Sequence, residues 1–319
     1  MQLSPEDRMN DGTIAFLDAD AVRTALPMAS AIAALQRALR DGLDPESDPA
    51  RSVVPAEHGQ LLLMPSHAAG YAGVKIASVA PANPDRGLPR IQGSYLLFDA
   101  ETLRPVAVLD GIALTAVRTA AVSAAAADLL AVPDAQRLVV FGTGPQAHSH
   151  VEALRAIRPL RHITVVGRDP QRLARFLGQY EAAADVSVEA GTADAVATAD
   201  LVACCTTART PLFDGSALPA RATVVAVGSH ERDAREVDDE TVRRSMVVVE
   251  ARSAALREAG DVVLAVESGA LDADELVAFA GLARGEARVD GSRPRLFKSV
   301  GMAWEDLVLA GVAYEALRN

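Results

Sequence analysis

The pattern of apolar and polar positions changes in the middle of the chain. Residues 51–110 carry short apolar runs separated by Pro, Gly and Asn, with no helical segments between them. Such runs predict an antiparallel sheet. From Arg137 onward, continuous apolar runs of strand length alternate with segments of helical periodicity. This alternation is typical of a parallel sheet covered by helices on both faces, so the sequence predicts an α/β fold in two parts.

Helices are predicted on either side of the antiparallel part. Two short helices precede it, the second of which ends at Gly42, and a long Ala-rich helix follows over roughly 112–131. After the last apolar run of the parallel part, residues 295–317 predict a short strand and then an amphipathic helix.

The balance of charge limits the classes of partner. A formal net charge of −11 argues against nucleic acid and anionic membranes, although a few local cations can still hold a small anion. The helix over 112–131 contains Arg118 and Asp128, so we interpret it as a packed helix rather than a membrane span. No basic and apolar export signal begins the chain, and Cys204 and Cys205 are adjacent on a predicted strand. We therefore expect a cytoplasmic protein with two reduced thiols.

A glycine-rich turn follows the first strand of the parallel part. Gly142, Gly144 and Ala147 form a G-x-G-x-x-A pattern between that strand and a helix. Gly142 permits the tight turn, Gly144 lets the backbone approach a pyrophosphate, and Ala147 keeps the helix close to the strand. The helix N-terminus adds amide groups and a positive end for phosphates. We predict a dinucleotide-binding turn that also includes Thr143 and Gln146.

The end of the next strand bears on which dinucleotide binds. NAD-binding proteins usually carry Asp or Glu there, whereas NADP-binding proteins favour a nearby Arg. Here Gly167 takes the acidic position and Arg168 follows. Asp169 precedes Pro170 and is typical of a helix N-cap. The sequence favours NADP(H), with NAD(H) as the alternative.

The carboxyl ends of later strands complete the predicted cofactor pocket. Thr206 and Thr207 follow one strand and Val227 follows another, at the edge where open parallel sheets bind ligands. His148 and His150 are two apart on a helix and therefore lie on different faces, so we predict no metal site.

One lysine lies within a predicted strand. The segment "GVKIASV" places Lys75 among apolar residues that a strand interior prefers. A buried ammonium group has to be paired, or it loses its charge by desolvation. The residues alone leave open whether Lys75 reaches the sheet edge through its long stem or serves a buried anion.

Several motifs occur in the order that one enzyme family has them. They run from about residue 45 to the last helix and read "LLLMPSH", "GVKIASVAPANPDRGLP", "GSYLLFDAETLRPVAVLDGIALTAVRTAAVSA", "GTGPQA", "DLVACCTTARTPLF", "VVAVGSHERDAREVD" and "FKSVGMAWEDL". On this ordered set the chain resembles the ornithine cyclodeaminase and mu-crystallin family.

The resemblance implies a homodimer of two-domain subunits. Residues 1–127 and 296–319 would form an α+β domain for substrate binding and dimerisation, and residues 128–295 the Rossmann dinucleotide-binding domain. Lys298 would face either the substrate or the dimer partner. The resemblance also brings three residues of the C-terminal segment toward the nicotinamide ring: Ser299, Val300 and Gly301.

The resemblance further implies small α-amino or α-imino acid ligands, whose carboxylate is clamped by Arg51, Lys75 and Arg118. Physical chemistry agrees, because a buried carboxylate needs cationic donors to offset its desolvation. Lys75 would also be within reach to donate the proton that accompanies hydride transfer.

Two positions depart from the cyclodeaminases of this family, which carry carboxylates there to handle the amino groups of ornithine. Leu62 stands at one position, and Ser229 and His230 stand at the other. A leucine can neither accept a proton nor orient an ammonium group, so we do not expect ornithine cyclisation.

The remaining features favour an NAD(P)H-dependent reductase of cyclic ketimine carboxylates, such as Δ1-pyrroline-2-carboxylate and Δ1-piperideine-2-carboxylate. In this interpretation His230 is either a general acid or polar wall of the pocket, or a loop residue facing solvent. The alternatives are a cyclodeaminase or alanine-dehydrogenase-like enzyme of amino acids, and a non-catalytic NADPH-dependent protein that binds small ligands.

Overall fold

The computed structural model describes residues 13–181 and 184–318 of the chain. These residues divide into two compact units, one made of residues 13–118 and 302–318 and the other of residues 119–181 and 184–301. The sequence placed these boundaries at 127/128 and 295/296.

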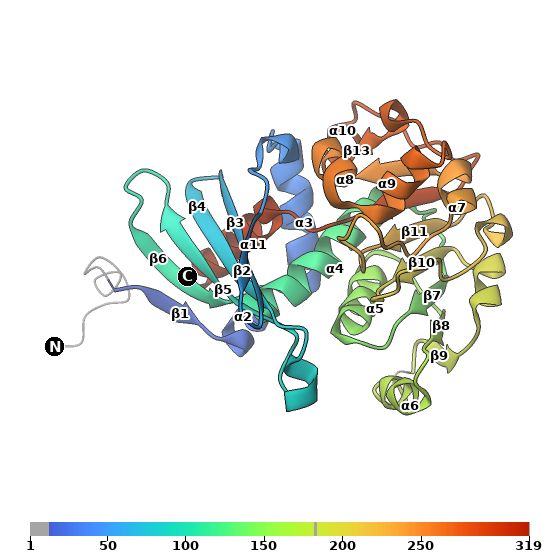
Figure 1. The fold of residues 1–319 in the computed structure, drawn as a ribbon, viewed down its shortest axis with the longest axis horizontal. Coiled ribbons are helices and arrows are strands. Elements are labelled where there is room, and N and C mark those ends of the chain that lie inside the picture. Colours follow the sequence, from blue (N-terminus) through green and yellow to red (C-terminus); the bar gives the residue numbers. More distant parts are fainter. Residues whose placement is uncertain (1–12, 182–183, 319) are drawn as a thin grey trace. The chain divides into compact units, whose positions relative to one another are not determined.

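The first unit is built on a six-stranded sheet in the order β1-β6-β5-β4-β3-β2 (Figure 1). Its strands β2 to β6 pair antiparallel, as the apolar runs of residues 51–110 predict, and β1 adds to β6 in parallel. The sequence did not predict β1, which is only three residues long. The strands are β1 (Ala15–Leu17), β2 (Ser52–Ala56), β3 (Gly59–Ala68), β4 (Tyr71–Val79), β5 (Ile91–Asp99) and β6 (Pro105–Asp110).

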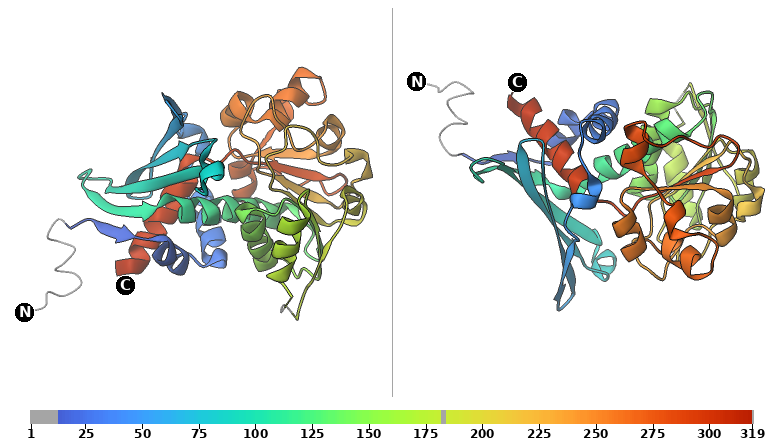
Figure 2. Two further views of the ribbon diagram at one scale, coloured as in Figure 1. Left: turned by 60° about the horizontal axis from the view of Figure 1, so that its bottom comes forward. Right: turned by 90° about the horizontal axis from the view of Figure 1, so that it is seen from above.

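Three helices of the first unit lie on one face of this sheet: α2 (Ala19–Ala25), α3 (Met28–Arg40) and α11 (Ala303–Arg318). Helix α11 packs against β3, β4 and β5 on one side and against α2 and α3 on the other (Figure 2). The strands accordingly alternate, with side chains toward α11 buried and side chains on the other face half-exposed.

Helix α11 lacks the solvent-exposed polar face that an amphipathic helix would have. Ten of its residues are buried, including Glu305 and Asp306 in its first turn. A helix sandwiched between a sheet and two other helices is enclosed on nearly all sides, which explains why its polar residues are buried as well.

The second unit contains an eight-stranded parallel sheet in the order β13-β12-β14-β11-β10-β7-β8-β9. The strand order changes direction between β7 and β10, with β8 and β9 added on one side and β10 and β11 on the other, as in doubly wound dinucleotide-binding folds. The predicted α/β class is confirmed. The strands are β7 (Arg137–Phe141), β8 (His162–Val166), β9 (Ser187–Ala190), β10 (Leu201–Cys204), β11 (Thr223–Ala226), β12 (Met246–Val249), β13 (Val277–Ala278) and β14 (Arg295–Lys298).

Strand β14 explains why the second unit extends past residue 295. It pairs with β11 on one side and β12 on the other, so it belongs to the interior of the parallel sheet. The helices of this unit are α5 (Pro145–Ile157), α6 (Pro170–Gly178), α7 (Asp239–Arg244), α8 (Arg252–Glu258), α9 (Gly260–Glu267) and α10 (Phe279–Ala283).

Helix α4 (Gly111–Leu130) begins in the first unit and ends in the second. Helix α4 is long and apolar enough to cross a membrane, but 67% of its apolar 18-residue stretch is buried inside the protein. Burial of this kind is typical of a core helix, which agrees with the interpretation of this segment as packed.

Candidate functional site

Lys75 lies at the centre of β4, on the face that packs against α11. It pairs across the sheet with Met64 of β3 and Tyr95 of β5, and all three are buried. Its Nζ donates to Oδ2 of Asp306 at 2.6 Å. Lys75 therefore does not reach the sheet edge, because it is held by a buried carboxylate of the last helix.

Arg118 of α4 joins the same group of charges. Its Nη1 donates to Oε2 of Glu305 at 2.8 Å, and its Nε lies 3.5 Å from Oδ1 of Asp306. The structure thus brings together Lys75 and Arg118, two of the three predicted clamp residues, on adjacent carboxylates of α11. We call Lys75, Arg118, Glu305 and Asp306 the buried charge cluster.

The first turn of α11 is fixed from two directions. Asp48 accepts a hydrogen bond from the Trp304 amide at 2.7 Å and another from Ser66 of β3 at 2.6 Å. Burial raises the pKa of Asp48, and these hydrogen bonds counteract that rise. Glu305 also accepts from the Met302 amide at 3.2 Å. Glu305 is therefore held by the backbone as well as by its cation, and Asp48 fixes the start of the helix that carries both carboxylates.

The environment of Lys75 changes its proton affinity. Burial and the nearby Arg118 guanidinium lower the pKa of Lys75 to about 8, while the Asp306 and Glu305 carboxylates oppose that shift. Burial also raises the pKa of Tyr95, which stays a neutral phenol. A lysine with a pKa near neutrality can hold and release a proton at working pH.

Two buried polar atoms near Lys75 have no hydrogen-bond partner among the described residues. They are the Tyr95 hydroxyl and Oδ1 of Asp306. Gly73 makes room for the Tyr95 hydroxyl, because a Cβ at Gly73 would collide with it. Buried polar groups are rarely left without partners, so these atoms fit a site that receives a small polar ligand.

The third predicted clamp residue, Arg51, lies immediately before β2 and is half-buried. Because Ser52 pairs with Leu63, the register continued by one residue places Arg51 opposite Met64, in line with Lys75. Leu62 lies on the same face as Met64, and its buried cluster with Ala77 and Val79 forms an apolar wall one row from Lys75.

The glycine turn of the second unit has the geometry that a pyrophosphate needs. Gly142 has φ +111°, and a Cβ there would lie 2.5 Å from the Cys205 carbonyl oxygen. Gly144 begins α5 without a side-chain cap, and a Cβ there would meet nothing within 4 Å. Buried Ala147 lets α5 pack closely, and the half-buried Gln146 has an Oε1 without a hydrogen-bond partner. These residues fit a dinucleotide.

In the turn after β8, Asp169 is the helix N-cap that the sequence predicted. Asp169 caps α6 by accepting from the amides of Gln171 and Arg172, and these hydrogen bonds lower its pKa. The Asp169 carboxylate is thus engaged by its own helix. Arg168 is exposed beside it, and Gly167 contacts Thr143 of the glycine turn, where a Cβ would come within 2.8 Å of the threonine methyl.

A buried glutamate organises the predicted nicotinamide loops. Glu236 accepts from the amide and hydroxyl of Thr206 at 2.8 and 2.7 Å, and from the Gly228 amide at 2.7 Å. It thereby ties the loop after β10 to the loop after β11, where Val227 lies. Burial raises the pKa of Glu236, and the Lys298 ammonium counteracts that rise. Thr207, which follows Thr206, is exposed.

Lys298 has a different role from the two that the sequence left open. Its Nζ donates to the Ser229 carbonyl at 2.7 Å and pairs with Asp261 at 2.9 Å, all inside the second unit. Ser229 is buried, and its hydroxyl donates to the Ala234 carbonyl at 2.7 Å. His230 is exposed in the same loop, so its predicted role as general acid or pocket wall stays a prediction.

A second glutamate holds the end of β14. Glu250 accepts from the Ser299 hydroxyl at 2.7 Å and from the amides of Val300 and Gly301 at 3.0 and 3.2 Å. Gly301 has φ +73°, a conformation that favours glycine. The three residues predicted to approach the nicotinamide are therefore fixed in one tight turn.

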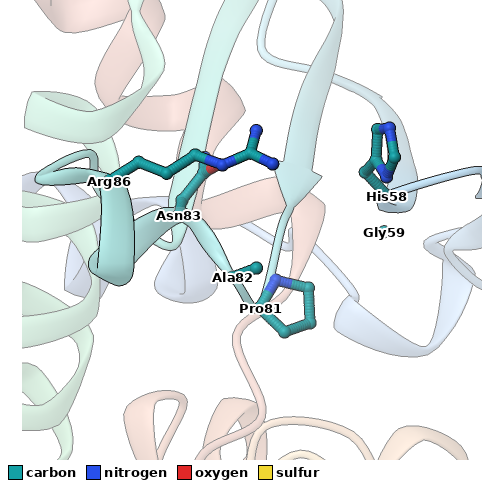
Figure 3. A pocket seen from close by; sticks show the side chains of 6 residues that line it. All are labelled: His58, Gly59, Pro81, Ala82, Asn83 and Arg86. Carbon is teal, nitrogen blue, oxygen red and sulfur yellow. The ribbon is translucent and has the colours of Figure 1, made fainter.

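The cavity shown in Figure 3 lies away from these residues. It measures about 270 Å³ and is lined by His58, Gly59, Pro81, Ala82, Asn83 and Arg86. His58 and Gly59 belong to the β2–β3 hairpin, and the others belong to the connection between β4 and β5. The cavity contains none of the predicted site residues.

Five buried acidic residues escaped the sequence analysis: Glu236, Glu250, Asp261, Glu305 and Asp306. All are at most 2% exposed. Glu305 and Asp306 lie in the quoted motif "WEDL", and Glu250 ends the apolar run "MVVVE". An acidic residue inside an otherwise apolar segment was the feature of the sequence that could have indicated a buried carboxylate.

Comparison with known proteins agrees with a chain that combines a dinucleotide-binding turn and a buried charge cluster. The family model for the ornithine cyclodeaminase/mu-crystallin family matches residues 14–319. The Δ1-pyrroline-2-carboxylate/Δ1-piperideine-2-carboxylate reductase of Azospirillum brasilense is 38% identical over 303 residues, which are 93% of this chain and 95% of that protein.

Two solved structures share the fold over nearly the whole chain. The Δ1-pyrroline-2-carboxylate reductase of Thermococcus litoralis, in complex with NADH and L-proline, has a TM-score of 0.89 at 30% identity, over 95% of this chain and 97% of that one. An archaeal alanine dehydrogenase dimer with bound NAD has a TM-score of 0.88 at 27% identity, over 95% of each chain. With its glycine turn, buried charge cluster and ordered motifs, the chain belongs to the ornithine cyclodeaminase/mu-crystallin family.

Proposed function

We propose that this protein is an NAD(P)H-dependent reductase of small cyclic ketimine carboxylates, which converts Δ1-pyrroline-2-carboxylate to L-proline and Δ1-piperideine-2-carboxylate to L-pipecolate. The observation that carries the proposal is the convergence of Lys75 and Arg118 beside an apolar wall. The Azospirillum brasilense relative, a reductase of both imino acids, and the Thermococcus litoralis Δ1-pyrroline-2-carboxylate reductase support it.

Each part of such a substrate has a matching group in the first unit. A guanidinium binds a carboxylate through paired hydrogen bonds, and Arg118 supplies one where bulk water is excluded. The methylene carbons of a five- or six-membered ring suit the wall of Leu62, Ala77 and Val79. A carboxylate at position 62 would instead suit a second ammonium group, so Leu62 disfavours ornithine.

The second unit would hold the dinucleotide. The N-terminus of α5 and the turn Gly142–Gly144 receive the pyrophosphate, and the loops fixed by Glu236 and Glu250 receive the nicotinamide end. When bound in its reduced form, the nicotinamide supplies the hydride. The residues of the chain bind and orient the imino acid and supply the proton.

NADPH is the preferred cofactor in this proposal. Asp169 is engaged as the cap of α6, and Arg168 is exposed at the end of β8. A 2′-phosphate would give Arg168 a charge-assisted partner. We expect Arg168→Ala to raise the KM for NADPH at least about tenfold and to leave the KM for NADH nearly unchanged. Steady-state kinetics with both cofactors measures this, and equal effects on the two would contradict the assignment.

Turnover is tested by mixing the protein with NADPH or NADH, adding Δ1-pyrroline-2-carboxylate, and following the absorbance of the reduced nicotinamide. We expect rapid oxidation of NADPH. Δ1-Pyrroline, the same ring without the carboxylate, serves as the control and should react poorly because Arg118 then has no partner in the substrate. Oxidation of NADPH at equal rates with both rings would contradict the proposed binding of the substrate carboxylate by Arg118.

Arg118→Lys provides a matched protein control, since it keeps a cation for Glu305 but loses the planar fork. We expect the KM for the imino acid to rise about tenfold while the dissociation constant of NADPH is unchanged. Tight NADPH binding by the wild type without turnover of any imino acid would favour the ligand-binding alternative. Release of ammonia from ornithine would favour the cyclodeaminase alternative.

A homodimer is part of the same proposal. On the face of the six-stranded sheet opposite α11, an unbroken row of apolar residues crosses five strands: Pro65, Val74, Leu96, Val108 and Phe16. Phe16 is 72% exposed. An exposed apolar face of this kind is typical of an interface, and the archaeal alanine dehydrogenase that shares this fold is a dimer.

A further inference from the structure

The chain is almost free of lysine. It contains 31 lysine and arginine residues together, and only Lys75 and Lys298 are lysines. Both are buried, and each is paired with a buried aspartate, Asp306 for Lys75 and Asp261 for Lys298. Arginine stays charged under all ordinary conditions, whereas a buried lysine can release its proton. Lysine at position 75 therefore provides a property that the surface cations of this chain do not have.

Asp306 is the carboxylate that contacts Lys75 directly. Its Oδ2 lies 2.6 Å from Nζ, and its other oxygen lies 3.5 Å from Nε of Arg118. Glu305, on the same turn of α11, bonds to Arg118 at 2.8 Å instead. Two further titratable groups lie nearby, the phenol of Tyr95 in β5 and the Asp48 carboxylate, which interacts electrostatically with both Tyr95 and Asp306. The hydrogen bond of Lys75 thus goes to Asp306, and that of Arg118 goes to Glu305.

This division balances the charges of the cluster. Lys75 and Arg118 contribute two positive charges, and Glu305 and Asp306 contribute two negative ones. Without Asp306, burial and the Arg118 guanidinium would both act against the ammonium form of Lys75 with little to oppose them. Asp306 therefore decides whether Lys75 enters the reaction with a proton.

We propose that Asp306 is a positioning residue that keeps Lys75 protonated and fixes its Nζ, so that Lys75 serves as the proton donor to the substrate nitrogen. This inference rests on the proposed function. In the reduction, the imine carbon gains the hydride of the nicotinamide, which is oxidised. The π pair of the C=N bond takes one proton from Nζ to form the N–H bond, and Lys75 is left as a neutral amine. Water then returns a proton to Nζ.

The scarcity of lysine makes a direct test possible. Protein labelled with carbon-13 at the lysine ε position gives two NMR signals, one from Lys75 and one from Lys298, which Lys298→Arg assigns. We expect the Lys75 signal to titrate with a midpoint near pH 8 in the wild type. In Asp306→Asn the midpoint should fall by about 1–3 pH units, because an opposite charge in direct contact is lost. The Lys298 signal, from the other unit, serves as the internal reference.

Glu305→Gln is the matched control. It removes a buried carboxylate from the same turn of α11, but one that bonds to Arg118 and not to Lys75. We expect its Lys75 midpoint to move by less than half as much as in Asp306→Asn. The proposal is overturned if the two variants shift the midpoint equally, or if Asp306→Asn leaves it unchanged. Should Asp306→Asn fail to fold, Asp306→Glu takes its place, because it keeps the charge but moves the carboxylate. We again expect a lowered midpoint for Lys75. An unchanged midpoint would contradict the proposal.

The link to catalysis is read from the pH profile of kcat/KM. In the wild type we expect activity to decline on the alkaline side with the titration of Lys75. In Asp306→Asn that limb should move to lower pH with the NMR midpoint, so that much of the activity returns on acidification. A variant damaged only in its structure would lose activity at every pH, and that result would overturn the proposal. Because the NMR titration needs no turnover, failure of the proposed reaction and failure of the Asp306 assignment give different results.

Discussion

His150 shows how burial alone sets the protonation of a side chain in this fold. It lies fully buried in α5, where Nδ1 is 2.8 Å from the Gln146 carbonyl and Nε2 is 2.9 Å from the Ser123 hydroxyl. A carbonyl only accepts, so Nδ1 carries the proton, while Nε2 and the Thr119 carbonyl, 3.0 Å from the Ser123 hydroxyl, compete for the single proton of that hydroxyl. Burial lowers the pKa of His150 to about 4.

This shift predicts a pH dependence of stability. Between pH 6.5 and about 4 the unfolded chain binds a proton at His150 that the folded protein does not, so the free energy of unfolding decreases as the pH falls. From pH 7 to pH 5 the contribution amounts to about 2 kcal/mol. Urea titrations at both pH values should show that His150→Gln loses less stability than the wild type. Equal losses would mean that His150 is protonated in the folded state.

At this scale the sequence identified the cations of the site but not their partners. Lys75 was conspicuous as a charge within an apolar strand, and Arg118 followed from the resemblance to the family. Asp306 and Glu305 lie 231 and 187 positions from the cations that they bind. No local pattern reports a contact over such a separation, because it depends on how α11 packs against the sheet.

The turn between β7 and α5 combines two glycines that are needed for different reasons. Gly142 has φ +111° and approaches the Cys205 carbonyl, so a side chain would strain the backbone and push β7 away from the loop after β10. Gly144 has φ −91°, which any residue adopts, and faces open space. One glycine therefore serves the fold, and the other leaves room for the ligand.

This difference gives a paired prediction. Gly144→Ala should fold with a melting temperature close to that of the wild type but should bind NADPH at least about tenfold more weakly, because its methyl group takes the space of the pyrophosphate. Gly142→Ala should lower the melting temperature as well, since strained positive-φ positions cost about 1 kcal/mol or more. Thermal melts and NADPH fluorescence titrations measure both. Normal NADPH binding by Gly144→Ala would show that the pyrophosphate lies elsewhere.

Elements with a strong repeating pattern were the easiest to predict. Helix α5 follows the glycine turn as the sequence predicted, and the apolar runs became β7, β8, β10, β11 and β12. The strands β1 and β13 were missed because three and two residues carry too little periodicity to distinguish them from loops. Strand β9 was missed because its four residues are mostly exposed and include only two apolar ones, whereas β10, β11 and β12 are apolar runs of the same length. Helix α11 was expected to have a polar face because its sequence does not reveal that elements cover both sides.

The proposed dimer is tested on the two faces of the six-stranded sheet. We expect Val74→Lys, in the middle of the apolar row, to convert a dimer into a monomer, because an ammonium group would have to be buried at the interface. Val53→Lys is the control, since Val53 pairs with Leu62 on the opposite face and is already 52% exposed. Sedimentation equilibrium measures the mass, and circular dichroism checks the fold. A Val74→Lys dimer would exclude this face as the interface.

The placement of β14 and α11 has a consequence for how the protein is made. Strand β14 completes the interior of one sheet, and α11 provides the counter-ions and much of the core against the other. During translation, both units lack these parts until residues 295–318 have left the ribosome. Until then Lys75 and Arg118 lack the carboxylates of α11, and β11 and β12, which β14 separates, each have an unpaired edge. Both units are therefore expected to complete their folding only after residues 295–318 have been synthesised.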